Sequence, residues 1–87
     1  MPRIIDGERC NIVGEQVYLY RKKRKYSQKI LSEKLETMAI YICRGSISRI
    51  EDGSRTVTDI ELYGLAKVLG VSIEELFPPS SSINLSS

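Results

Sequence analysis

The sequence predicts a compact, all-α bundle of five helices. Apolar residues recur at spacings of three and four along most of the 87-residue chain, as they do on the buried face of a helix. Asn, Ser or Thr, which are residues that cap helix N-termini, precede several of these stretches. The connections are short, and there is no internal repeat and no convincing pair of strands. At this length the chain should form one domain, near the small end of what buries its own core.

The composition is that of an ordinary globular domain. Hydrophobic residues make up 41% and charged residues 28% of the chain. No stretch approaches the roughly 20 apolar residues that span a bilayer, and the charged segment 1–10 does not resemble a secretory signal. We therefore expect a cytoplasmic protein that does not interact with membranes.

Neither metal nor catalytic chemistry is indicated. Two cysteines without any histidine are too few for a zinc site, so we expect reduced thiols, with redox sensing or metal binding as the alternatives. The sequence also has no glycine-rich phosphate loop and no clustered acid pair. We therefore expect no catalytic residues, no cofactor and no enzymatic activity.

The N-terminal half should contain an arm and two helices. Residues 1–10 lack periodicity and are interpreted as a flexible arm. A first helix should begin near Asn11, a capping residue, and run to about Arg24. After a short connector, a second helix should begin at Ser27. Each has one apolar face: Val13, Val17 and Tyr20 in the first helix, Leu31 and Leu35 in the second.

The segment between the second and third helices is unusual. Glu36–Cys43 is mostly apolar and becomes β-branched from Ile40 onward. We expect the second helix to continue for about one extra turn and then to give way to an extended connection, with a short strand as the alternative. A third helix should run from Arg44 to Asp52 and end before Gly53, which suits the left-handed conformation that follows many helices.

A fourth helix follows the loop Ser54–Val57. It opens at Thr58 with a capping box, because the side chain of Glu61 can reach back to the cap. Gly70 ends this helix. Its buried stripe should consist of four residues: Leu62, Leu65, Ala66 and Leu69.

The chain should end with a short helix and a tail. Ser72–Glu75 forms a second capping box, and it opens a fifth helix that runs through Phe77. Pro78-Pro79 prevents continuation. The helical domain therefore covers residues 11–77, and the serine-rich segment 78–87 is expected to be a flexible tail.

The third helix has the residue pattern of a helix that enters the major groove of DNA. On a helical wheel at about 100° per residue, Ile47 and Ile50 face the core. Arginine can donate two hydrogen bonds to guanine, and serine can contact several base edges. Gly45 either allows a close approach of the backbone to DNA or simply begins the helix. The outward positions are small or polar, with Arg44 on one flank: Gly45, Ser48, Arg49 and Asp52.

One acidic residue of the third helix should be buried. Glu51 flanks Ile47 and Ile50 on the wheel and so points inward, where a carboxylate needs a partner. Arg21 lies four residues after Val17, at the edge of the apolar face of the first helix. We predict an Arg21–Glu51 ion pair that joins the first and third helices and has a structural role.

Basic residues are concentrated in the N-terminal half. Residues 1–49 hold 11 of the 13 Lys and Arg but 5 of the 11 Asp and Glu, whereas residues 50–87 hold 2 and 6. One half of the chain is therefore suited to a polyanion. The run Arg21–Lys25 is interpreted as a patch that faces phosphates. A solvated helix end, favoured by the helix dipole, and a nuclear localisation signal are the alternatives.

Several pieces of the sequence occur together in a specific order: Arg21, then Ser27–Leu35, Ile47–Gly53, Leu65–Ser72 and Glu75–Phe77. In this order they resemble the phage repressor/Cro (Xre-type) helix-turn-helix family over about residues 12–77. The resemblance implies a five-helix domain of the repressor/Cro-like type. It also implies that the second and third helices form a unit that reads DNA.

The resemblance further implies roles for individual residues. The base-contacting positions fall on Arg44, Gly45, Ser48 and Arg49. Gln28, which opens the second helix, would contact a phosphate and brace the third helix, with Lys29 beside it at the DNA backbone. The loop that contacts the backbone falls on Ser54, Arg55 and Thr56. The family's arginine–glutamate pair falls on Arg21 and Glu51.

The sequence departs from the family at the link between the second and third helices. The stretch from Leu35 to Ile47 is about five residues longer than a usual tight turn. Cys43 also stands where a serine or threonine normally caps the third helix. The angle between the two helices, and hence the set of side chains that reach bases, is therefore open.

These observations together predict a sequence-specific transcription regulator. It should read double-stranded DNA in the major groove with residues 44–52, and bind as a homodimer to a two-fold operator. The alternative is a protein–protein interaction module, such as an antitoxin-like partner, that keeps the helix-turn-helix fold. The outward Arg44 and Arg49 argue against that alternative.

Overall fold

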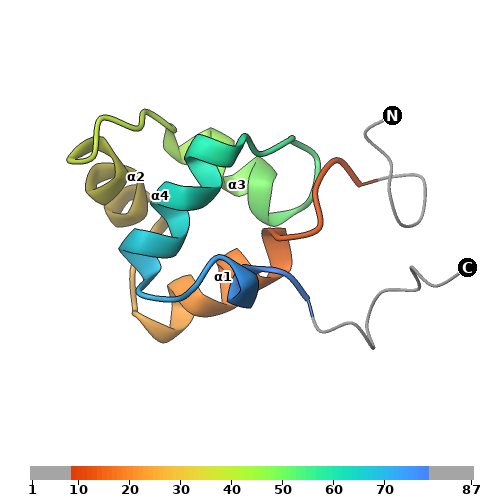
Figure 1. Cartoon of the computed structure of the whole chain (residues 1–87). Helices are drawn as coiled ribbons and strands as arrows, with labels where there is room; N and C mark the ends of the chain where they lie inside the picture. Colours follow the sequence, from red (N-terminus) through yellow and green to blue (C-terminus); the bar gives the residue numbers. More distant parts are fainter. Residues whose placement is uncertain (1–8, 79–87) are drawn as a thin grey trace, which may run out of the picture.

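The computed structural model describes residues 9–78, which form four α-helices and one 3-10 turn (Figure 1). No residue in this range is part of a strand, so the all-α class is confirmed. Most of the predicted arm, 1–10, and tail, 78–87, lies outside the described residues. The elements are α1 (Gly14–Lys23), α2 (Gln28–Glu36), α3 (Arg44–Glu51), α4 (Asp59–Leu69) and η1 (Glu74–Leu76).

The core lies where all five elements meet. In Figure 1, α1 (orange) runs below α2, α3 and α4, and the segment that follows α4 (blue) crosses α1. Burying one aliphatic side chain contributes roughly 1.5–3 kcal/mol, so most of the stability comes from this contact region. Eight side chains are fully buried there: Val17, Leu31, Leu35, Ile47, Ile50, Leu65, Leu69 and Leu76.

The prediction of a fifth α-helix is wrong, because the segment forms a single 3-10 turn. Both bonds of the predicted capping box are present: Ser72 N donates to Glu75 Oε1 (2.8 Å), and Glu75 N donates to Ser72 Oγ (3.2 Å). The backbone of Phe77 is nevertheless extended (φ −87°, ψ 144°). Pro78 follows Phe77, and the residue before a proline is sterically disfavoured in the helical region. The proline therefore ends the helix one turn after it starts.

α1 begins at Gly14, three residues after the predicted start. The side chain of Asn11 still satisfies the helix end, because its Oδ1 accepts hydrogen bonds from Val13 N (3.1 Å) and Gly14 N (2.8 Å). Its Nδ2 donates to Ile50 O (3.1 Å) and Arg55 O (2.7 Å). A Cβ at Gly14 would lie 2.1 Å from Ile50 O, so only glycine allows this approach. Asn11 thus connects the start of α1 to the end of α3.

The predicted extra turn of α2 is also wrong, whereas residues 40–43 form a non-helical connection, as expected, with an extended backbone at Cys43. α2 ends at Glu36, and the backbone of Ala39 is left-handed (φ 61°), which a continuing α-helix does not allow. Ile40 and Ile42 then enter the core with 8% and 3% exposure. The Cδ1 atom of Ile40 lies only 2.4 Å from the position that a Cβ at Gly64 would occupy. The buried Ile40 therefore fixes the connector against α4.

Capping explains the bounds of α4. Thr58 Oγ1 accepts a hydrogen bond from Glu61 N (3.2 Å), and Thr58 N donates to Glu61 Oε1 (3.0 Å), so the predicted capping box forms. Gly70 ends the helix in the left-handed conformation (φ 73°).

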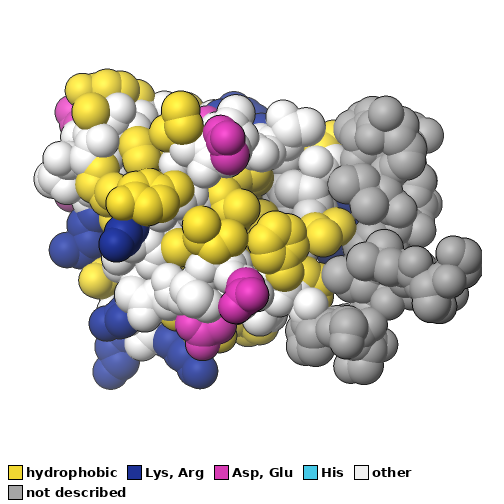
Figure 2. All heavy atoms as spheres, viewed as in Figure 1, with side chains coloured by type: hydrophobic (Ala, Val, Ile, Leu, Met, Phe, Trp, Pro, Cys, Tyr) yellow, Lys and Arg dark blue, Asp and Glu magenta, His cyan; other side chains and the backbone are white. Residues whose placement is uncertain are grey.

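Figure 2 shows hydrophobic side chains across the face formed by α4 and the segment that follows it. Ile60 and Tyr63 of α4 and Ile73 and Phe77 after it are exposed. None of the helices formed by residues 9–78 combines the length and apolar character needed to cross a membrane.

Candidate nucleic-acid interface

The side chains of α3 divide into a buried and an exposed set, as its helical periodicity predicts. Ile47 and Ile50 are 0% exposed and anchor the helix in the core. The opposite side of the helix offers two guanidinium groups and a hydroxyl to solvent without any acidic residue in the first turn. The exposed predicted site residues are Arg44, Gly45, Ser48 and Arg49.

The first turn of α3 is held by a short series of side-chain contacts. Cys43 is the N-cap residue but makes no capping bond with its side chain. Its Sγ instead contacts Ser46 Oγ (3.5 Å), and this hydrogen bonding lowers the pKa of the thiol. Arg49 Nη2 donates to the same hydroxyl (3.3 Å). A Cβ at Gly45 would meet nothing closer than 3.8 Å, so no contact within the described residues requires glycine there.

Arg21 and Glu51 form the ion pair that joins α1 to α3. Arg21 Nε donates to Glu51 Oε2 (2.5 Å), and Arg21 Nη2 donates to Glu51 Oε1 (3.1 Å). The side chains are 8% and 7% exposed. Arg21 Nη1 also donates to Tyr26 O (2.8 Å), and Gln28 Nε2 donates to Glu51 Oε1 (3.0 Å). One carboxylate therefore fixes the ends of three helices relative to one another.

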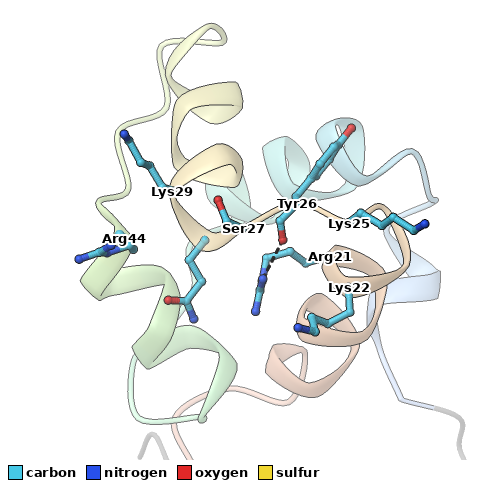
Figure 3. A pocket seen from close by; sticks show the side chains of 8 residues that line it. Arg21, Lys22, Lys25, Tyr26, Ser27, Lys29 and Arg44 are labelled. Carbon is cyan, nitrogen blue, oxygen red and sulfur yellow. Dashed lines mark hydrogen bonds between the residues drawn. The ribbon is translucent and has the colours of Figure 1, made fainter.

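A basic depression of about 780 Å³ lies beside this network, where α1 ends and α2 begins. In Figure 3, Lys29 and Arg44 extend on one side of it, from α2 and α3. Lys22, in the last turn of α1, and Lys25, in the connector to α2, lie on the other side. The first turn of α2 contains no acidic residue, so the positive end of its dipole adds to these cations. The depression is therefore suited to an anion such as a phosphate.

The loop after α3 contains the other predicted backbone contacts. Ser54 and Thr56 are exposed, and Ser54 Oγ donates to Asp52 Oδ1 (2.6 Å). This bond lowers the pKa of Asp52. Arg55 instead makes two parallel bonds to Glu61, from Nη1 to Oε1 and from Nη2 to Oε2, both 2.9 Å. The guanidinium of Arg55 is therefore engaged within the protein, and sequence reasoning did not identify this pair.

The Arg55–Glu61 pair gives a pH-dependent prediction. The bonds from Arg55 hold the pKa of Glu61 below its usual value, so the pair stabilises the fold above the pKa of an unfolded glutamate and is lost as the pH falls through the lower folded value. Glu61→Gln should therefore reduce the free energy of unfolding by roughly 0.5–1 kcal/mol at pH 7 and by much less at pH 3. Urea unfolding at both pH values measures this, with the exposed Glu74→Gln as control. A difference of the same size at pH 3 and pH 7 would contradict the assignment.

Metal-binding groups and paired cysteines are absent from residues 9–78. Residues 9–78 contain no group of three or more His, Cys, Asp or Glu side chains that could hold a metal ion. Cys10 and Cys43 are both free thiols.

Solved structures similar to this chain include two DNA-binding proteins. The first is SinR, described as the master regulator for biofilm formation and solved in complex with DNA; it is 29% identical over 74% of this chain and 95% of its own, with a TM-score of 0.64. The DNA-binding domain of BldD is 25% identical over 77% of this chain and 90% of its own, with a TM-score of 0.64.

A third similar structure is an enzyme. Hydroxypropylphosphonic acid epoxidase from S. wedmorenis is 25% identical over 83% of this chain, with a TM-score of 0.68, but the match covers only 36% of the epoxidase. The likeness is therefore confined to a minor part of that protein.

No curated protein matches the chain in sequence. A sequence model of the helix-turn-helix family, however, matches residues 17–76, which extend from the middle of α1 to the end of η1. This range contains the Arg21–Glu51–Gln28 network and every residue that lines the basic depression. The chain therefore belongs to the helix-turn-helix family.

Proposed function

We propose that this protein is a sequence-specific DNA-binding regulator that inserts α3 into the major groove. The observation that carries the proposal is the arrangement of α3: two isoleucines and the Glu51 network hold it, while Arg44 and Arg49 are exposed. Two of the similar structures support it, since SinR was solved with DNA and the BldD structure is a DNA-binding domain.

The exposed residues of α3 would read bases. Each guanidinium can donate two hydrogen bonds to O6 and N7 of a guanine, which discriminates that base by about 1–3 kcal/mol. Ser48 would contact an adjacent base edge. Gly45 leaves the start of α3 without a side chain, so the backbone can lie close to the DNA there.

Other residues would position the protein on the DNA backbone. Gln28 and Lys29 lie at the positive end of α2, beside the basic depression, and would contact one phosphate region. Ser54 and Thr56 would contact the backbone through the loop after α3. Arg55 would act there indirectly, because its guanidinium holds the loop through Glu61.

The salt dependence of binding tests the phosphate contacts. Each phosphate contact steepens the fall of log K with log[salt] by about 0.9, so Lys29→Ala should weaken binding to all duplexes and reduce the slope by about 1. Lys67→Ala, on α4, should leave the slope unchanged. Fluorescence anisotropy with a labelled duplex at several salt concentrations measures both. Failure of the wild-type protein to bind any duplex at low salt would contradict the proposal and favour a protein-interaction module.

We further propose that the protein acts in the cytoplasm as a homodimer on a two-fold site. Dimeric helix-turn-helix proteins place their recognition helices about 34–36 Å apart, one turn of DNA. The exposed Ile73 and Phe77, which follow α4, are candidates for the contact between the two copies.

A further inference from the structure

The long connector between α2 and α3 is a fixed part of the structure. Ile40 and Ile42 are buried, and Ser32 Oγ of α2 donates to Ile42 O (2.7 Å). Ile40 N donates to Leu35 O (3.1 Å) just after the turn at Ala39. Two buried side chains and two hydrogen bonds therefore fix the course of residues 40–43, in which buried and exposed residues alternate.

Tyr41 lies between the two buried isoleucines and is 75% exposed, more than any other large hydrophobic residue within 9–78. Successive side chains of an extended segment point to opposite sides, so Tyr41 and Cys43 lie on the same outward side. Cys43 contacts Ser46, and Ser46 accepts a hydrogen bond from Arg49. The exposed side of α3 therefore continues beyond its N-terminus onto Tyr41.

The surface beside Tyr41 is hollowed, and its lining residues include one carboxylate and no lysine or arginine. A depression of about 380 Å³ is lined by six residues: Ser32, Glu36, Tyr41, Ile42, Cys43 and Ser46. The carboxylate of Glu36 would repel a phosphate at this place, whereas the tyrosine ring and the thiol offer apolar surface. An apolar group on a base edge fits this surface better than the DNA backbone does, and the major groove carries one such group, the methyl of thymine.

We propose that Tyr41 contacts the methyl group of a thymine just outside the base pairs read by Arg44 and Arg49. This inference rests on the proposed function of α3. The longer connector would then extend the recognised sequence by about one base pair, because it places an aromatic ring at the end of the recognition helix.

Replacing thymine by uracil removes only the methyl group and keeps every hydrogen-bonding atom of the base pair. Affinity is measured by fluorescence anisotropy for duplexes that carry thymine or uracil at each flanking position in turn. At one position, uracil should weaken binding of the wild-type protein about three- to fivefold, the value of one buried methyl group. Tyr41→Ala should abolish this difference, and Tyr41→Phe should retain it. Tyr63→Ala, an exposed tyrosine on α4, should also retain it.

Two outcomes would overturn the inference while leaving the proposed function in place. In the first, the difference in affinity between thymine and uracil either persists in Tyr41→Ala or is absent at every flanking position. The other is an equal loss of affinity in Tyr41→Phe and Tyr41→Ala for both bases, which would assign the contact to the hydroxyl group and the DNA backbone. The proposed function fails separately, if the wild-type protein binds none of the duplexes.

Discussion

Glu51→Ala is expected to reduce the free energy of unfolding by about 3–5 kcal/mol, because it leaves the buried guanidinium of Arg21 without its counter-charge. Arg21 as a whole is only 6% exposed. Gln28 would also lose its partner on α3. For a domain of this size the midpoint of thermal unfolding should fall by on the order of 15 °C or more. Thermal and urea unfolding followed by circular dichroism measure the effect.

A matched control separates burial from charge. Glu33 forms an exposed pair with Lys29 on α2 at 4.0 Å, with side-chain exposures of 59% and 73%. Glu33→Ala should therefore change stability by no more than about 0.5 kcal/mol. The double variant Arg21→Leu/Glu51→Leu removes both charges, and it should be more stable than Glu51→Ala alone. An unchanged melting temperature for Glu51→Ala would contradict a structural role for the pair.

Arg44→Ala and Arg49→Ala should each weaken binding to the preferred DNA site by about 1–3 kcal/mol, or roughly 5- to 150-fold. Both side chains are exposed, so the melting temperature should change little. The loss should be largest for the duplex with the preferred base at one position, since the arginine no longer discriminates that base. Anisotropy titrations with the preferred duplex and with single-base variants measure both effects.

The control for these variants is Lys34→Ala. Lys34 lies on α2 with its ammonium group over the ring of Tyr26, so it is not among the predicted base contacts. The control variant should retain the specificity of the wild-type protein. If Arg44→Ala and Arg49→Ala both bind the preferred site as tightly as the wild-type protein, then α3 does not read bases through these side chains.

The sequence correctly predicted the start of a helix where a single capping side chain determines it. Ser27 and Thr58 cap α2 and α4 at the predicted residues. Periodicity likewise indicated that Ile47 and Ile50 are buried. The wrong predictions involve competing local effects: Asn11 caps α1 from a distance of three residues, Ala39 adopts a left-handed conformation, and Pro78 stops the last helix. Residue propensities alone do not predict which of these local effects determines where a helix begins or ends.

In the candidate site, too, contacts that follow from helical spacing could be predicted, and contacts that depend on a loop could not. The Arg21–Glu51 contact could be predicted because each residue lies at the edge of an apolar stripe, so the wheel places both at one helix interface. The Arg55–Glu61 pair could not be predicted, because it depends on the course of the loop before α4 rather than on helical spacing. It also shows that a residue placed at the DNA by resemblance can be held by a partner within the protein.

The most direct test of the account is selection of bound duplexes from a random DNA pool, with the wild-type protein and with Arg44→Ala/Arg49→Ala in parallel. The wild-type protein should enrich a two-fold symmetric site with half-sites about 10–10.5 base pairs apart. The double variant should lose base preference at the positions that the two arginines contact. Enrichment of no sequence by the wild-type protein, or of the same sequence by both proteins, would contradict base reading by α3.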